Sequence, residues 1–176
     1  MEVYETLQKR KSTRSYDARS IPDDVLGRVL EAGRIAPSAV NYQPWHFIVV
    51  KEQERRDILS KAPFARFLKE SPVVIVGCGD SRKSPKWHVV DVAIAMQQIV
   101  IAATSEGLGT CWIGSFYEDK VRNLLKIPDR YRVVALLAVG YPKEKSSILG
   151  KLKRSTSRKD LSEIVSMEEF GQAMKN

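Results

Sequence analysis

The chain has 176 residues, of which 43% are hydrophobic and 28% charged, with a formal net charge of +8. This size and composition are typical of one globular domain that folds without disulfides, so we expect a single domain over residues 1–176. The two cysteines, Cys78 and Cys111, lack metal-site spacing and are expected to be buried free thiols, with no metal bound. No apolar run reaches the roughly 18 residues of a membrane span and the start is no signal peptide, so the sequence predicts a cytoplasmic protein.

The first third of the chain predicts two helices, a loop and a strand. A short helix covers Val3 to Leu7 and ends near Arg10. After Pro22, apolar residues recur at the i, i+3, i+4 spacing of an amphipathic helix, which Pro37 stops. Residues 36–44 form a loop, and residues 45–50 (WHFIVV) follow as a strand.

The remaining elements alternate less regularly. Helices are predicted at 52–62, 89–105 and 117–127, and strands at 72–79, 109–114 and 132–142. The helix at 89–105 is apolar on nearly all sides, so it is expected deep in a core or in a subunit interface. Residues 161–170 predict either a strand or a short helix. The order of these elements indicates an α+β domain with about four strands.

The first stretch that suggests a ligand is RKSTRSY, residues 10–16. Arg10, Lys11 and Ser12 offer a guanidinium fork, a point charge and a hydroxyl, which together suit a phosphate. Arg14 would point the same way as Ser12 on an extended backbone, and the distant Arg158 could reach the same anion. The glycine-rich phosphate loops of Rossmann and P-loop proteins are absent. The alternative is that these are solvated surface cations following a helix.

The second such stretch is APSAVNYQPWHF, residues 36–47. Ser38 and Asn41 offer hydrogen bonds and Ala39 allows close approach, so this loop could border a planar heterocycle with polar edges. The alternative is a plain helix-to-strand connection that buries Trp45.

These stretches, with the long helix leading into GLGTCWIG and with SRKDLSEIV near the end, resemble the nitroreductase family of FMN-dependent oxidoreductases. They appear in the family's order and cover most of the chain; APSAVNYQPW is the most specific of them. The resemblance implies a nitroreductase-like α+β fold with a central, mostly antiparallel sheet of about four to five strands flanked by helices. It also implies an intertwined homodimer with FMN at the subunit interface.

The resemblance assigns the FMN phosphate to basic residues from both ends of the chain. Arg10, Lys11 and Ser12 match positions that hold the phosphate and ribityl chain, and Arg158 matches a C-terminal phosphate arginine. Arg14 matches a position near the pyrimidine edge of the flavin. Lys11 stands where many members have arginine or histidine.

Three further segments match positions around the flavin ring. Residues 37–39 match a segment packed beside the ring, and Asn41 matches an amide that contacts the cofactor from the partner subunit. Residues 112–114 match a strand end that lies along the ring and offers a backbone donor near N5. A lysine contact to the ring in some members has only Arg66 as a weak counterpart, and Val40 replaces a common glycine. The residues assigned around the ring are Pro37, Ser38, Ala39, Asn41, Trp112, Ile113 and Gly114.

The implied activity is hydride transfer from NADH or NADPH through flavin N5 to an electron-poor acceptor, a nitroaromatic or quinone, by a ping-pong scheme. FMN carries this chemistry, so no side chain is assigned as a catalytic acid, base or nucleophile. A specialised member of the same scaffold, which fragments flavin, dehalogenates or oxidises azolines, remains an alternative. A basic nucleic-acid-binding module is a more remote one, since no helix-turn-helix, zinc or RNP signature is present.

Overall fold

The structure is a computed structural model that describes residues 2–143 and 158–173, in two compact units, Met1–Lys143 and Glu144–Asn176. The described part of the second unit contains a short helix, α6 (Leu161–Ile164), so residues 161–164 form a helix rather than a strand. Asp160 and Glu163 close a capping box at its start. The expectation of one domain over 1–176 stays a prediction.

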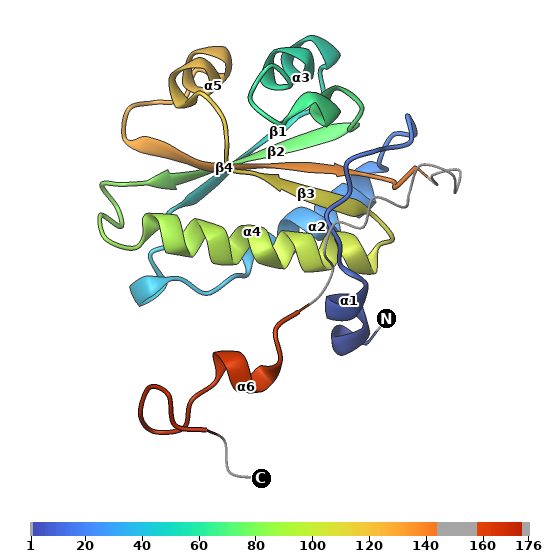
Figure 1. The fold of residues 1–176 in the computed structure, drawn as a ribbon. Coiled ribbons are helices and arrows are strands. Elements are labelled where there is room, and N and C mark those ends of the chain that lie inside the picture. The colour runs from blue at the N-terminus through green and yellow to red at the C-terminus, as the bar shows by residue number, and fades with distance from the viewer. Residues whose placement is uncertain (1, 144–157, 174–176) are drawn as a thin grey trace. The chain divides into compact units, whose positions relative to one another are not determined.

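The first unit is built on a sheet whose neighbouring strands are all antiparallel (Figure 1). Within the described residues it has four strands in the order β1-β2-β4-β3. Their bounds are β1 (Trp45–Val50), β2 (Val73–Asp80), β3 (Gly109–Ile113) and β4 (Tyr131–Gly140). The predicted α+β class with a central antiparallel sheet is therefore confirmed.

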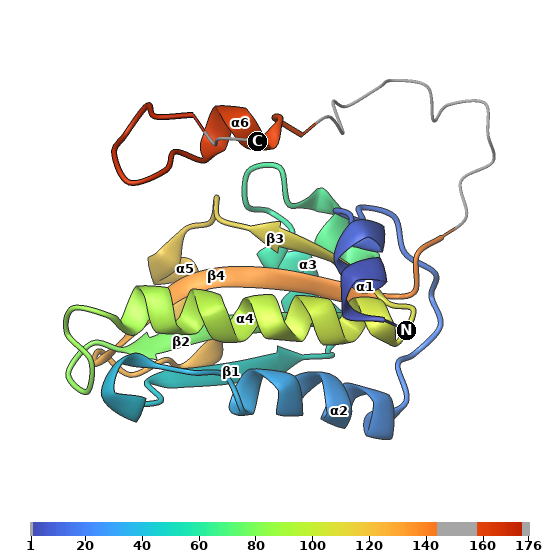
Figure 2. The same cartoon turned by 90° about the horizontal axis from the view of Figure 1, so that it is seen from below.

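Helices cover both faces of this sheet (Figures 1 and 2). α3 (Gln53–Leu59) and α5 (Glu118–Leu125) lie over one face, and α2 (Asp23–Arg34) and α4 (His88–Ser105) over the other. α1 (Val3–Lys9) contacts α4. The sheet is therefore the middle layer of three, with a hydrophobic core on each side.

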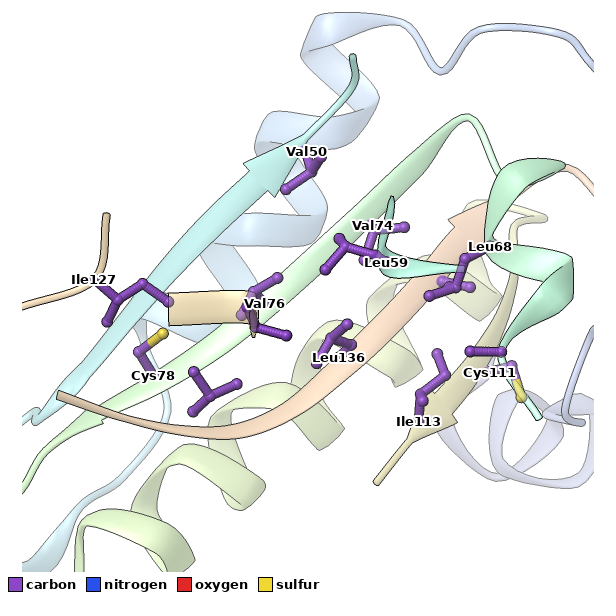
Figure 3. Packing of buried hydrophobic residues seen from close by; sticks show 14 of the residues in the cluster. Val50, Leu59, Leu68, Val74, Val76, Cys78, Cys111, Ile113, Ile127 and Leu136 are labelled. Carbon is purple, nitrogen blue, oxygen red and sulfur yellow. The ribbon is translucent and has the colours of Figure 1, made fainter. Parts of the chain in front are cut away.

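Strand β2 explains why PVVIVGCG reads as a continuous apolar run. Val74 and Val76 point into the core under α3, where they meet Leu59 and Leu136 (Figure 3). The alternate residues, such as Ile75, point into the core under α2 and α4. Because both faces are covered, every position of the strand from Val73 to Gly79 is apolar or small, as in other doubly covered strands.

The two cysteines are buried and form no disulfide among the described residues, as predicted. Both belong to the core shown in Figure 3. Burial raises the pKa of the Cys78 thiol to about 11, which leaves it protonated and poorly nucleophilic at neutral pH.

Helix α4 is, within the described residues, long and apolar enough to meet the length and composition of a membrane-crossing helix. However, one side of it, including Met96, Ile99 and Val100, is buried against the sheet, as in a core helix. The other side leaves Val89 and Ile94 exposed. Helix α4 thus has a core face and an uncovered apolar face in the single chain.

Candidate functional site

The basic segment RKSTRSY lies along the outer edge of β3. The N–H of Thr13 donates to the carbonyl of Thr110 at 2.8 Å, and Ser12 forms a parallel bridge with Thr110. The hydroxyl of Tyr16 donates to the carbonyl of Thr13 at 2.6 Å, and burial raises the pKa of this phenol. A Cβ at Gly109 would overlap the Thr13 side chain, so the glycine permits this close packing. The buried Thr13 and Tyr16 therefore fix the segment to the sheet.

The other side chains of this segment turn away from the core. Lys11, Ser12 and Arg14 are exposed and Arg10 is half-buried. Among the residues that the structure describes, Arg10, Lys11 and Arg14 form no ion pair. The neighbouring Lys9, in contrast, pairs with Glu5 at 2.6 Å. The result is a fixed cluster of uncompensated positive charge, which attracts anions.

The end of β3 continues the same edge of the sheet. Trp112 is 37% exposed and Gly114 is exposed, with open space where a Cβ would stand. Backbone groups alternate sides along a strand, so the N–H of Trp112 lies on the same edge as the Thr110 carbonyl. The Ile113 side chain is 5% exposed and belongs to the core, and its backbone pairs with Leu136 on the β4 side, so neither points to the open edge.

A hollow of about 530 Å³ brings Arg14 together with Arg66, the weakly assigned arginine. Phe64, which is 92% exposed and has a φ of 60°, also lines it. Sequence reasoning did not select Phe64 or Lys69, because no local pattern indicates that they neighbour Arg14. The lining residues are Arg14, Phe64, Arg66, Phe67, Lys69 and Glu70.

The loop after α2 has an unusual backbone. It contains a one-turn 3₁₀ helix, η1 (Ala39–Asn41), and left-handed φ values of 49° at Val40, 54° at Asn41 and 46° at Gln43. The N–H of Gln43 donates to the Ser38 hydroxyl at 2.8 Å, and the Gln43 amide donates to the Asn41 side chain at 3.1 Å. The loop is therefore an ordered structure held by its own polar side chains.

One bond joins this loop to the start of α4. The N–H of Ala39 donates to the carboxylate of Asp91 at 3.0 Å, and the Asp91 side chain is buried. Asp91 was not predicted as a site residue. The signal available in the sequence was a single carboxylate within an otherwise apolar helix, because a buried acid requires a partner.

The two predicted halves of the site lie at opposite ends of α4 (Figure 2). Ala39 is bonded to Asp91 in the first turn, whereas the basic segment pairs with Thr110, shortly after the helix ends at Ser105. A helix rises about 1.5 Å per residue, so Asp91 and Ser105 are about 21 Å apart along the axis. A single copy of the chain thus does not bring residues 10–14 and 37–41 together.

Arg158 belongs to the described part of the second unit, where it is exposed just before α6. Its assignment to the same phosphate as Arg10 stays a prediction. In residues 2–143 and 158–173, no group of three His, Cys, Asp or Glu side chains is placed to hold a metal ion.

Replacing Val40 with glycine should increase the free energy of unfolding of the flavin-free protein by about 0.5–1 kcal/mol. Val40 is β-branched, has a φ of 49° and is 84% exposed, so the substitution relieves a left-handed strain and removes little packing. Chemical denaturation measures the change. Val40→Ala is the control: it retains a Cβ and should gain less. A loss of stability in Val40→Gly would contradict the strain.

Comparison with known proteins assigns this chain to a family. The family model "Nitroreductase family" matches residues 7–72 and 59–141, which together include most of the first unit. The chain is 38% identical to an NADH dehydrogenase/NAD(P)H nitroreductase of Methanothermobacter thermautotrophicus, over 82% of this chain and 79% of the relative. The chain therefore belongs to the nitroreductase family.

Solved structures agree with this assignment. A nitroreductase family protein from Clostridium difficile 630 superposes with a TM-score of 0.83 and 32% identity, covering 96% of this chain and 99% of that one. An FMN-dependent nitroreductase from Clostridium difficile R20291 gives a TM-score of 0.80 and 28% identity, covering 94% and 98%. The predicted nitroreductase-like fold is confirmed.

Proposed function

We propose that the protein is an FMN-dependent oxidoreductase that takes reducing equivalents from NADH or NADPH. Its relative in M. thermautotrophicus is named for NAD(P)H and its structural neighbour from C. difficile R20291 for FMN. The observation that carries the proposal is the unpaired cationic segment fixed along the edge of β3, in a chain of this family.

The residues present fit the phosphate of FMN. Arg10, Lys11 and Ser12 supply two positive charges and a hydroxyl, and no carboxylate of the described residues neutralises Arg10 or Lys11. A phosphate dianion pairs well with such donors through charged hydrogen bonds. The resemblance to the family assigns Arg158 to this phosphate as well, and that assignment stays a prediction.

The flavin ring would lie beside the β3 edge. Trp112 and Gly114 would border it, with their backbone N–H groups on the open edge, and Ile113 lies between them in the strand. Arg14 and Arg66, which share one hollow, would hold its pyrimidine edge. When bound, FMN would accept a hydride from NAD(P)H and pass two electrons to an acceptor. The protein's part is to position the ring and place positive charge beside it.

A second copy of the chain would complete the site. Pro37, Ser38, Ala39 and Asn41 lie at the opposite end of α4 from the basic segment, so they would serve the cofactor of the partner. In such a homodimer, a two-fold axis across α4 would set the start of one helix near the end of the other.

The uncovered face of α4 supports this homodimer. Val89, Val90 and Ile94 are exposed there and line a shallow hollow of about 560 Å³ with Gln98. An exposed apolar patch of this kind is typical of a subunit interface.

The acceptor that we propose is an electron-poor small molecule, a nitroaromatic or a quinone. It would occupy the position that the nicotinamide leaves, in a ping-pong scheme with one shared pocket. We propose that the protein acts in the cytoplasm. That compartment supplies reduced pyridine nucleotides and keeps thiols such as Cys78 reduced.

The test is to saturate the purified protein with FMN, remove the excess, and add NADH or NADPH without oxygen. We expect the flavin absorbance to bleach with at least one of them and to return when a quinone or nitroaromatic is added. A protein that retains no FMN, or a bound flavin that neither nucleotide bleaches, would contradict the proposal. The two additions also establish the nucleotide preference.

A further inference from the structure

We propose that Asp91 is a positioning residue, whose buried carboxylate holds the loop of residues 38–41 in the conformation that presents it to a cofactor. This inference deepens the proposed function and rests on it. Asp91 itself is buried on α4, and among the described residues its side chain forms no hydrogen bond or ion pair with the basic segment or the β3 edge. Its effect would therefore pass through the loop.

The geometry of Asp91 carries the first step. The carboxylate is 3% exposed, and its Oδ1 accepts the Ala39 N–H at 3.0 Å. Its Oδ2 accepts the hydroxyl of the fully buried Ser84 at 3.3 Å. A buried carboxylate is costly unless its oxygens are hydrogen-bonded. Ser84 thus orients the carboxylate through Oδ2, and Oδ1 is left to accept the hydrogen bond from the loop backbone.

The loop needs such an anchor. Directly after Ala39 come two left-handed residues, Val40 and Asn41, and the valine is β-branched and 84% exposed. Strained backbone persists only where its surroundings hold it. The other side-chain bonds of this loop, from Ser38 and Gln43, join the loop to itself. Among the side-chain hydrogen bonds of the described residues, the one to Asp91 joins the loop to the body of the fold.

The position of Asp91 adds a link to the dimer. It lies in the first turn of α4, one residue from the exposed Val90 on the face proposed as the subunit interface. The same helix would therefore bring the two copies together and set the position of the loop that each copy offers to its partner. The loop anchor, Asp91, and the proposed interface residue Val90 therefore lie in the same turn of α4.

The experiment compares Asp91→Ala, Asp91→Asn and Val100→Ala with the unchanged chain. First, hydrogen exchange at the Ala39 amide is measured in the flavin-free protein. Loss of a hydrogen bond to a charged acceptor should accelerate exchange about tenfold or more in Asp91→Ala. Asp91→Asn retains a neutral acceptor and should accelerate it about threefold. Val100→Ala, a core substitution farther along α4, lowers stability without touching the loop and controls for general loosening.

Second, the dissociation constant for FMN is measured at a temperature where every variant is folded. We expect it to rise about tenfold in Asp91→Ala, to recover largely in Asp91→Asn and to stay unchanged in Val100→Ala. A purely structural role would move the melting temperature of Asp91→Ala and leave both readouts at the values of Val100→Ala, which would overturn the inference. If Asp91→Ala does not fold, Asp91→Asn decides alone: unchanged exchange at Ala39 overturns the inference.

The two readouts separate this inference from the proposed function. Exchange at Ala39 needs no flavin, so an unaltered rate in both variants refutes the anchor even if the protein binds FMN. Conversely, failure of the unchanged chain to bind FMN refutes the proposed function, and with it the positioning role, whatever the exchange rates are.

Discussion

Replacing Arg10 with alanine should raise the dissociation constant for FMN about ten- to a hundredfold. Arg10 is half-buried at the start of the segment fixed to β3, and it has no ion pair among the described residues. A charged hydrogen bond to phosphate is worth about 1.5–3 kcal/mol, and each 1.4 kcal/mol is tenfold in affinity. Quenching of flavin fluorescence on titration gives the constant directly.

Two controls make the Arg10 result specific. Lys9→Ala removes the adjacent cation, which already pairs with Glu5 on the exposed side of α1, and should leave FMN binding within about twofold. Riboflavin lacks the phosphate, so Arg10→Ala should bind it as the unchanged protein does. An equal loss of affinity for riboflavin would show that the substitution disturbs the fold and not a phosphate contact.

Replacing Arg14 with alanine should lower the two-electron reduction potential of bound FMN by about 30–60 mV. Reduction adds negative charge at the N1 edge of the flavin, and the Arg14 guanidinium is proposed to lie beside it. Removing a charged hydrogen bond of about 1.5–3 kcal/mol disfavours the reduced form, and 30 mV corresponds to about 1.4 kcal/mol for two electrons. Equilibration with a dye of known potential, at saturating FMN, measures the shift.

Arg66 provides the companion experiment, since it lines the same hollow as Arg14. Arg66→Ala should also lower the reduction potential of bound FMN. Arg14→Lys keeps the positive charge, so its potential should stay close to that of the unchanged protein. Two neighbouring cations acting on one charge are expected to be non-additive in the double variant. A potential that stays constant in both single variants would remove the proposed electrostatic role of this hollow.

The architecture could be predicted largely because its signals are local. The strand at 45–50 has the predicted bounds, and the runs that became β2 and β4 read as apolar throughout because both faces of the sheet are covered. α2 starts after Pro22 as expected, although it ends at Arg34, before Pro37. Periodicity and proline position encode such features within a few residues.

The arrangement of the site could be predicted only in part. RKSTRSY was selected because its charges are adjacent in sequence, but its pairing with Thr110 depends on the closure of the whole sheet. The hollow shared by Arg14 and Phe64 joins segments that no motif connects. The bond between Asp91 and Ala39 likewise spans 52 positions of sequence. Contacts of this kind follow from the tertiary fold and leave no local pattern.

The sequence also did not indicate that the two predicted halves of the site are separated in space. Residues 10–14 and 37–41 are close along the chain, yet the structure places them at opposite ends of α4. The resemblance to the family implied a partner contribution for Asn41. Because α4 separates the whole loop from the basic segment, the same partner contribution is proposed for the other residues of the loop.

The most direct test of a shared flavin site is light scattering coupled to visible absorbance on the FMN-saturated protein as it leaves a sizing column. The mass should equal two chains, and the flavin absorbance should correspond to one FMN per chain within that peak. A one-chain peak that carries FMN in full would contradict the shared site, and a two-chain peak without flavin would contradict the cofactor.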